Sequence, residues 1–203
     1  TIEGCFSHPL AECVHSRMKE GSLAMEKTFQ DDMRDWARIC RRMHVWDYTT
    51  NYRHYLNPMP NFHVLQPNIK FFLENGVTGL FEQGNGESPS GEFGELRAYL
   101  ITKLMWNPDL DVSEAMNDFL TGYYGRAAAP IRAYIDMLRE HVVKQNIHVG
   151  IYCSPQQGHI PEPLLEKAEK LFDRAEALAD DEDVLARVQR SRLQIRYVRL
   201  NIT

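Results

Sequence analysis

The spacing of apolar residues along the chain predicts an α-helix over residues 22–43. Five apolar residues share one face of that helix because they lie four, three, four and three positions apart: Phe29, Met33, Trp36, Cys40 and Met43. Strand-forming residues follow at 44–48 and again at 77–83. Between these two strands, residues 64–75 have a helical pattern that ends at Asn75-Gly76, a common helix stop.

This order of helix, strand, loop, helix and strand is the repeating unit of a parallel α/β sheet or barrel. Each strand runs into a polar loop, at 49–60 after the first strand and at 84–94 after the second. Pro58 and Pro60 exclude regular structure from the first loop. Ligands bind at the C-terminal ends of parallel strands in barrels and open sheets, so these loops are where we expect a site.

From residue 94 onward the pattern is helical. Apolar spacing predicts helices near 94–107, from Ser113, from Ile131 to Val142, at 162–179 and at 182–199. The Pro-rich segment 147–163 is interpreted as a loop with one short strand at 149–152.

Two or three α/β units cannot close an eight-stranded barrel. We therefore expect an α/β fold in which residues 1–106 form the C-terminal strands and helices of a TIM (β/α)8 barrel. Residues 107–203 would form a helical C-terminal region.

Composition narrows the class of protein. The 203 residues are 43% hydrophobic and 25% charged, as in ordinary globular proteins. The formal net charge of −5 argues against a general nucleic-acid binder, and no apolar stretch approaches the length of a membrane span. The chain opens at Thr1 without an initiator Met or a signal segment, so we expect it to be part of a longer or processed chain.

The cysteines and histidines predict neither a cofactor nor a metal. No Cys-x-x-Cys pair is present, and Cys5 and Cys13 are either bridged across a loop or buried as thiols. His8, Cys13 and His15 have a spacing that matches no known ligand pattern. The Gly-rich loop at 84–94 lacks both the P-loop and the dinucleotide fingerprint.

The segment after the first strand combines a carboxylate with aromatic and amide side chains. A sugar site needs flat aromatic faces for stacking and polar groups for the hydroxyls, and both are dense here. The candidate residues are Trp46, Asp47, Tyr48, Asn51 and Tyr52. The alternative is a barrel rim in which the aromatic rings pack and Asp47 caps the loop.

Glu82 ends the second apolar strand and is followed by Gln83 and Asn85. A carboxyl group there is costly to bury unless it is paired or functional, and a raised pKa would let it act as a general acid. Asp47 and Glu82 are thus the candidate catalytic pair for glycoside hydrolysis, with Gln83 and Asn85 as sugar contacts. Alternatively, Glu82 forms a salt bridge with Arg53 or Arg97.

A series of motifs resembles a bacterial family of large, mostly uncharacterised secreted proteins. The motifs, in chain order, are Trp46-Asp47-Tyr48-Thr49-Thr50-Asn51, Pro58-Met59-Pro60-Asn61, Gly79-Leu80-Phe81-Glu82-Gln83-Gly84, the run from Glu95 to Pro108, and Gly122-Tyr123-Tyr124-Gly125. That family is similar to glycoside hydrolases with a TIM barrel, such as α-glucuronidases and β-hexosaminidases. The resemblance implies a carbohydrate substrate, a secreted or periplasmic location, and upstream strands that complete the barrel.

The leading hypothesis is therefore a glycoside hydrolase, or part of one, that acts on a polysaccharide or glycan by carboxylate acid/base chemistry. A second hypothesis is a carbohydrate-binding protein that keeps the barrel without the chemistry. A third is a helical interaction module built from residues 94–203. The position of Asp47 relative to Glu82 distinguishes the first hypothesis from the others.

Overall fold

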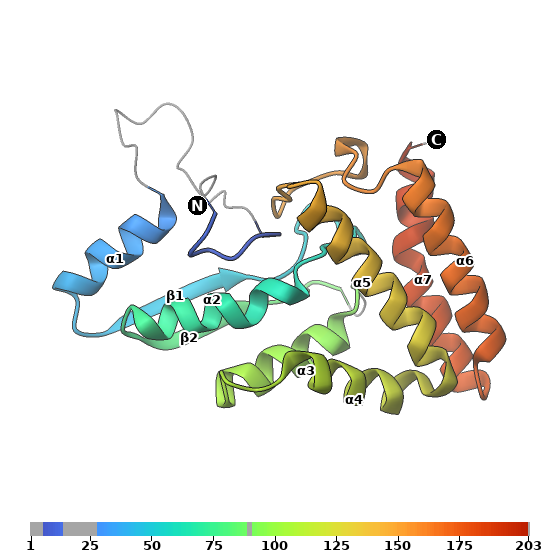
Figure 1. Cartoon of the computed structure of the whole chain (residues 1–203), viewed down its shortest axis with the longest axis horizontal. Helices are drawn as coiled ribbons and strands as arrows, with labels where there is room; N and C mark the ends of the chain where they lie inside the picture. The colour runs from blue at the N-terminus through green and yellow to red at the C-terminus, as the bar shows by residue number, and fades with distance from the viewer. Residues whose placement is uncertain (1–5, 14–27, 89–90, 203) are drawn as a thin grey trace.

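The computed structural model describes residues 6–13, 28–88 and 91–202 (Figure 1). Within these ranges the chain forms two strands, several α-helices and two short 3₁₀ turns. The elements follow in the order α1 (Phe29–Ile39), β1 (Met43–Tyr48), α2 (Phe62–Glu74), β2 (Val77–Gln83), α3 (Gly94–Trp106), α4 (Val112–Tyr124), η1 (Gly125–Ala127), α5 (Ala128–Lys144), η2 (Pro155–Gln157), α6 (Glu162–Leu178) and α7 (Glu182–Ile202).

Strands β1 and β2 pair in parallel, and α2 connects them (Figure 1). Val45 and Leu80 are register partners, and both pack on an apolar cluster that includes Phe71 and Phe72 of α2. This βαβ unit confirms the predicted strands and the helix between them. The predicted stop is also confirmed, because Gly76 has a φ of +76° directly after α2.

Helix α1 is shorter than predicted at its C-terminal end. It ends at Ile39, where Cys40 is already extended, and Met43 belongs to β1. Of the predicted apolar face, Met33 is buried in the helix, whereas Trp36 is 57% exposed. The prediction that the helix reaches residue 43 is wrong because the strand requires extended backbone from Met43 onward. The part of the prediction at 22–27 lies outside the described residues.

The second half of the chain is a layer of packed helices, as predicted. Its core continues from α2 through α7 as one apolar cluster, across the expected boundary after residue 106. The Tyr134 ring of α5 meets the Phe172 ring of α6 with centroids 5.0 Å apart. Tyr134 also donates a hydrogen bond to Gln194 Oε1 of α7 over 2.8 Å. Helices α5, α6 and α7 are therefore tied together by both apolar and polar contacts.

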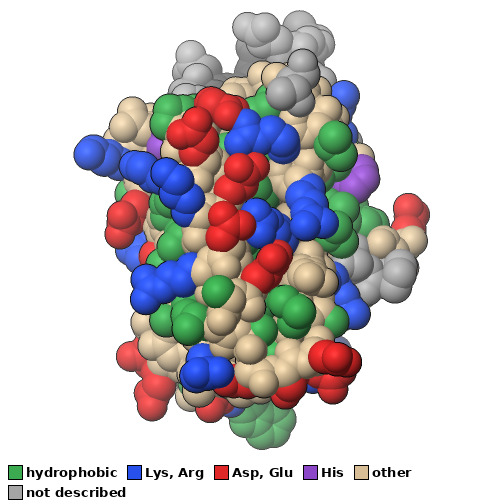
Figure 2. Space-filling model, turned by 90° about the vertical axis from the view of Figure 1, so that its right-hand side faces the viewer, with side chains coloured by type: hydrophobic (Ala, Val, Ile, Leu, Met, Phe, Trp, Pro, Cys, Tyr) green, Lys and Arg blue, Asp and Glu red, His purple; other side chains and the backbone are tan. Residues whose placement is uncertain are grey.

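The face formed by α6 and α7 is charged and mixed in sign. Figure 2 shows Lys and Arg side chains interspersed with Asp and Glu on this side of the molecule. Arg192 bonds Asp173 and Glu176 across the two helices, and Arg199 bonds Glu162 and Glu169. Ion pairs of this kind at a solvated surface contribute little to stability.

The short strand predicted at 149–152 is wrong. The segment forms a turn, although Val149 and Ile151 are buried as a strand pattern would suggest. Their carbonyl groups accept single hydrogen bonds from the backbone N–H of Phe6 and Tyr52, respectively. The apolar residues therefore serve a small separate core rather than a β-ladder.

The described part of the chain holds two parallel strands, so a barrel origin of the α/β unit stays a prediction. Within that same part, no helix is long and apolar enough to cross a bilayer. The side of the sheet that does not face α2 carries Trp46 and Phe81, which are 61% and 53% exposed.

Candidate functional site

Asp47 and Glu82 are register partners at the C-terminal ends of β1 and β2. Neighbouring strands lie about 4.8 Å apart, and residues opposite each other in register point to the same face of the sheet. The two carboxyl groups therefore lie side by side, on the face that also carries Val45 and Leu80. Both residues are half-buried.

The surroundings favour the protonated form of both carboxyl groups. Burial raises the pKa of Asp47 to about 6, and the backbone N–H of Tyr48, which donates to Oδ1 over 2.8 Å, opposes part of that shift. Burial and then the negative charge of Asp47 raise the pKa of Glu82 to about 8. Burial and mutual repulsion therefore disfavour the state in which both carboxyl groups are ionised.

The alternative of a salt bridge at Glu82 is not found in the described chain. The guanidinium group of Arg97 bonds Glu92 and Asn61 instead. No ion pair joins Glu82 to Arg53 in the part of the chain that the structure describes. Within the described residues, each carboxyl group of this pair thus has the other carboxyl group, and not a cationic side chain, as its charged neighbour.

Trp46 and Gln83 lie on the opposite face of the sheet from the carboxylate pair. Successive residues of a strand point to opposite sides, so Tyr48 shares this second face. Trp46 Nε1 donates to Gln83 Oε1 over 2.6 Å, and the Trp46 ring meets the Phe81 ring edge to face, with centroids 4.7 Å apart. These candidate sugar contacts thus form an exposed aromatic platform of their own.

The loop after β1 folds back over the strand ends. Tyr52 donates its hydroxyl hydrogen to the carbonyl oxygen of Gln83 over 2.6 Å, and its ring contacts those of Tyr48 and Tyr55. A pocket of about 330 Å³ opens beside it. The pocket is lined by residues from both post-strand loops and from α7: Tyr52, Arg53, His54, Tyr55, Leu56, Glu87, Ser88 and Leu193.

Helix α7 contributes a second contact to this loop, because the His54 ring stacks on the Tyr197 ring at 4.1 Å between centroids. The C-terminal helix therefore forms part of the pocket wall although it lies more than a hundred residues away in sequence. Sequence reasoning missed Leu193 and Tyr197, and their helical spacing alone marks them only as amphipathic positions.

The side chains of Asn51 and Asn85 form hydrogen bonds with the backbone of loops. Asn51 is fully buried, donates to the carbonyl oxygen of Cys153 over 3.0 Å, and accepts from the backbone N–H groups of Arg53 and His54. Asn85 Nδ2 donates to the carbonyl oxygen of Ser88. Both amides hold loop backbone in place, so their contribution to the pocket is its shape.

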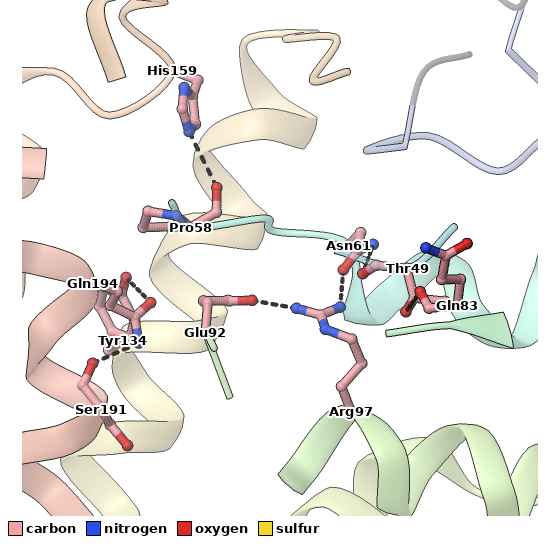
Figure 3. A network of polar contacts seen from close by, with 10 residues as sticks. All are labelled: Thr49, Pro58, Asn61, Gln83, Glu92, Arg97, Tyr134, His159, Ser191 and Gln194. Carbon is pink, nitrogen blue, oxygen red and sulfur yellow. Dashed lines mark hydrogen bonds and ion pairs between the residues drawn. The ribbon is translucent and has the colours of Figure 1, made fainter. Parts of the chain in front are cut away.

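A buried polar network joins the two post-strand loops to α3 (Figure 3). Arg97 donates to Glu92 and to Asn61 Oδ1, and Asn61 Nδ2 donates to the carbonyl oxygen of Thr49 over 3.1 Å. Glu92 was not predicted to be a site residue, and its position in a Gly-rich loop contained no signal for burial. Burial raises its pKa to about 7, even though the Arg97 charge opposes the shift.

No cluster of three or more potential metal-binding side chains occurs among the described residues. The His8 ring stacks on His148, and Cys13 Sγ lies 3.6 Å from His148 Nδ1. His15, of the possible metal-binding group, and Cys5, of the possible Cys5–Cys13 bridge, lie outside the described residues. Cys40 and Cys153 are free thiols.

A family model described as "Domain of unknown function (DUF4838)" matches residues 2–136. The match spans β1, β2 and α2 to α4, together with most of the loops described above, and the chain belongs to this family. The expectation of an uncharacterised family is thereby confirmed. No curated protein and no solved structure matches the chain.

Proposed function

We propose that this member of the DUF4838 family is a glycoside hydrolase, or part of one, in which Asp47 and Glu82 are the acid/base pair. The observation that carries the proposal is that the two carboxyl groups are register partners at the ends of adjacent strands, where burial raises the pKa of both. Glycoside hydrolysis requires one protonated and one ionised carboxyl group on either side of the scissile bond.

The causes of the two pKa shifts support a division of roles within the pair. Burial and the negative charge of Asp47 both raise the pKa of Glu82, so we assign it the role of the general acid that protonates the leaving oxygen. Asp47 then supplies the carboxylate that stabilises positive charge on the sugar or activates water. Carboxyl groups of glycosidases lie about 5–9.5 Å apart, a range that two neighbouring strands can provide.

The pocket beside Tyr52, which neither Asp47 nor Glu82 lines, would hold a sugar ring next to the one that is cleaved. Tyr52 and Tyr55 present aromatic surface, and Arg53 and Glu87 offer a donor and an acceptor for hydroxyl groups. Its volume of about 330 Å³ is within the range of small-molecule sites. Tyr52 connects this pocket to the strand ends through its hydrogen bond to the carbonyl group of Gln83.

We further propose that the two strands belong to a larger α/β barrel whose remaining strands come from upstream chain. Parallel sheets are normally covered on both faces, yet Trp46 and Phe81 are mostly exposed here. Closing the sheet into a barrel would enclose this face, while Asp47 and Glu82 would remain at the carboxyl ends of their strands, the end at which barrel enzymes hold their active sites. A chain extended upstream should then protect Trp46 from acrylamide quenching, and unchanged quenching would contradict the barrel.

The hydrolase proposal is tested with Asp47→Asn and Glu82→Gln in the full chain with its upstream barrel. Turnover is measured on a panel of uronic-acid and hexosamine glycosides, with Glu140→Gln on the exposed surface of α5 as the control. We expect each site variant to lose at least about a hundredfold in rate, which is the scale of general acid–base catalysis. Full activity in both site variants would remove these residues from the mechanism.

A second candidate function, carbohydrate binding without turnover, is favoured by one observation. The Trp46 ring is held in place by Gln83 and Phe81, with more than half of its surface free to stack on a sugar. In that case Trp46→Ala abolishes glycan binding measured by calorimetry. The control is Trp106→Ala, since Trp106 is exposed at the C-terminal end of α3 and is not one of the side chains that contact Trp46.

A further inference from the structure

Arg97 and Glu92 form the most deeply buried ion pair in the described part of the chain. Their side chains are only 4% and 2% exposed. The Arg97 guanidinium group also donates to Asn61 Oδ1 and lies 4.5 Å from the centre of the Phe62 ring. The group is therefore fixed by contacts on several sides.

The contacts continue from Arg97 to the ends of both strands (Figure 3). Asn61 Nδ2 donates to the carbonyl oxygen of Thr49, the residue that follows β1. Thr49 in turn donates to the carbonyl oxygen of Gln83 twice, from its backbone N–H over 3.1 Å and from Oγ1 over 2.8 Å. Thr49 lies two residues after Asp47, and Gln83 directly follows Glu82.

Stability alone does not explain this network. A buried ion pair recovers little more than the cost of removing two charges from water, and an apolar pair of the same volume often serves as well. A guanidinium group, however, offers several donors in one rigid plane, so it holds two acceptors at a set spacing. Here the two acceptors come from the post-β2 loop, through Glu92, and from the post-β1 loop, through Asn61.

We propose that Arg97 is a positioning residue that, through Asn61 and Thr49, fixes the distance between the carboxyl groups of Asp47 and Glu82. Arg97 touches neither carboxyl group, and it acts by holding the two strand ends together. An effect of Arg97 on catalysis rests on the proposed function. Its effect on the distance between the two carboxyl groups does not.

The test measures the protonation of Glu82 directly, without substrate. Infrared spectra of the full chain are recorded across pH 5–10, and the band lost in Glu82→Gln assigns the Glu82 carboxyl group. Arg97→Lys keeps the positive charge but removes the planar guanidinium group that binds two acceptors at once. We expect the Glu82 midpoint to fall by about one pH unit, because looser strand ends admit water and separate the two carboxylates.

Two further variants make the result specific. Thr49→Val keeps the volume of the side chain and removes only the Oγ1 bond to Gln83, so it should shift the midpoint in the same direction by a smaller amount. Arg192→Lys is the control, because Arg192 is a partly buried arginine that bonds two carboxylates between α6 and α7. Its replacement should leave the Glu82 midpoint unchanged.

The proposal is overturned if the Glu82 midpoint stays at its original value in folded Arg97→Lys and in Thr49→Val. Should Arg97→Lys fail to fold, Thr49→Val decides alone. A chain that hydrolyses no glycoside but shows the expected shifts would refute the proposed function and leave the positioning role intact. In an active enzyme, Arg97→Lys should lower kcat and move the pH optimum while changing KM little.

Discussion

Glu82 and Asp47 stand opposite each other on adjacent parallel strands, with no cationic side chain in the described chain paired to either. Two carboxyl groups in this position repel each other when both are ionised, so burial and proximity together raise the pKa of Glu82. This arrangement has consequences for stability that can be measured whether or not the protein is an enzyme.

Unfolding free energy should decrease as the pH rises from about 4.5 to 8. The folded state raises the pKa of Glu82 above its unfolded value, so it binds more protons than the unfolded state in this window. Each unit of pKa shift corresponds to about 1.4 kcal/mol, which is large enough to measure by urea denaturation. Glu82→Gln should flatten the decline, whereas Glu140→Gln should leave it as it is. An equal slope in wild type and Glu82→Gln would contradict the raised pKa.

Gly125→Ala should destabilise the chain by about 1–3 kcal/mol. Gly125 ends α4 with a φ of +52°, and an added Cβ would lie 2.5 Å from Asp180 Oδ2. Gly122→Ala is the matched control, since Gly122 lies within α4 and an added Cβ there meets nothing within 4 Å. That control should stabilise the helix by about 0.5–1 kcal/mol. Thermal melting distinguishes the two variants, and equal effects would argue against the tight turn.

Tyr134→Phe should lower the unfolding free energy by about 1–2 kcal/mol. The Tyr134 hydroxyl group is fully buried and donates to Gln194 Oε1, so its removal leaves that oxygen without its donor. Tyr152→Phe is the control, because Tyr152 is exposed by more than half. Chemical denaturation of both variants would show no difference between them if the bond from α5 to α7 contributes nothing.

Asn51→Ala should cost about 1–3 kcal/mol, because it removes the amide that joins the post-β1 loop to Cys153 and leaves two backbone N–H groups without an acceptor. Hydrogen exchange of Arg53 and His54 should increase in the variant. Asn117→Ala, at an exposed position of α4, should change stability by less than about 0.5 kcal/mol. Unchanged exchange at both loop residues would show that the loop is held by other contacts.

Periodicity identified most of the elements. The helix at 64–75, the strand at 77–83 and the helices after residue 94 are found close to where apolar spacing and stop residues put them. The prediction from sequence failed where apolar residues are buried without belonging to a strand or helix. Val149 and Ile151 are apolar and β-favouring, yet they fill a small core from a turn.

The candidate site was predictable only in part. Asp47 and Glu82 were predicted as site residues because they lie at the ends of the two strands. The same reasoning grouped them with Trp46 and Gln83, which lie on the other face of the sheet because successive strand residues alternate between faces. Glu92 was not predicted, because a single acidic residue in a Gly-rich loop has no pattern that marks it as buried.

The amino-acid pattern by itself determined that two strands end in polar loops and that helices follow, because these features depend on neighbours within a few residues. Only the tertiary structure decided that Asp47 meets Glu82 and that Arg97 binds Glu92 instead of Glu82. Register and ion-pair choice depend on how the strand faces pack against α2 and on which loops α3 reaches. Those contacts join residues distant in sequence, and no local pattern encodes them.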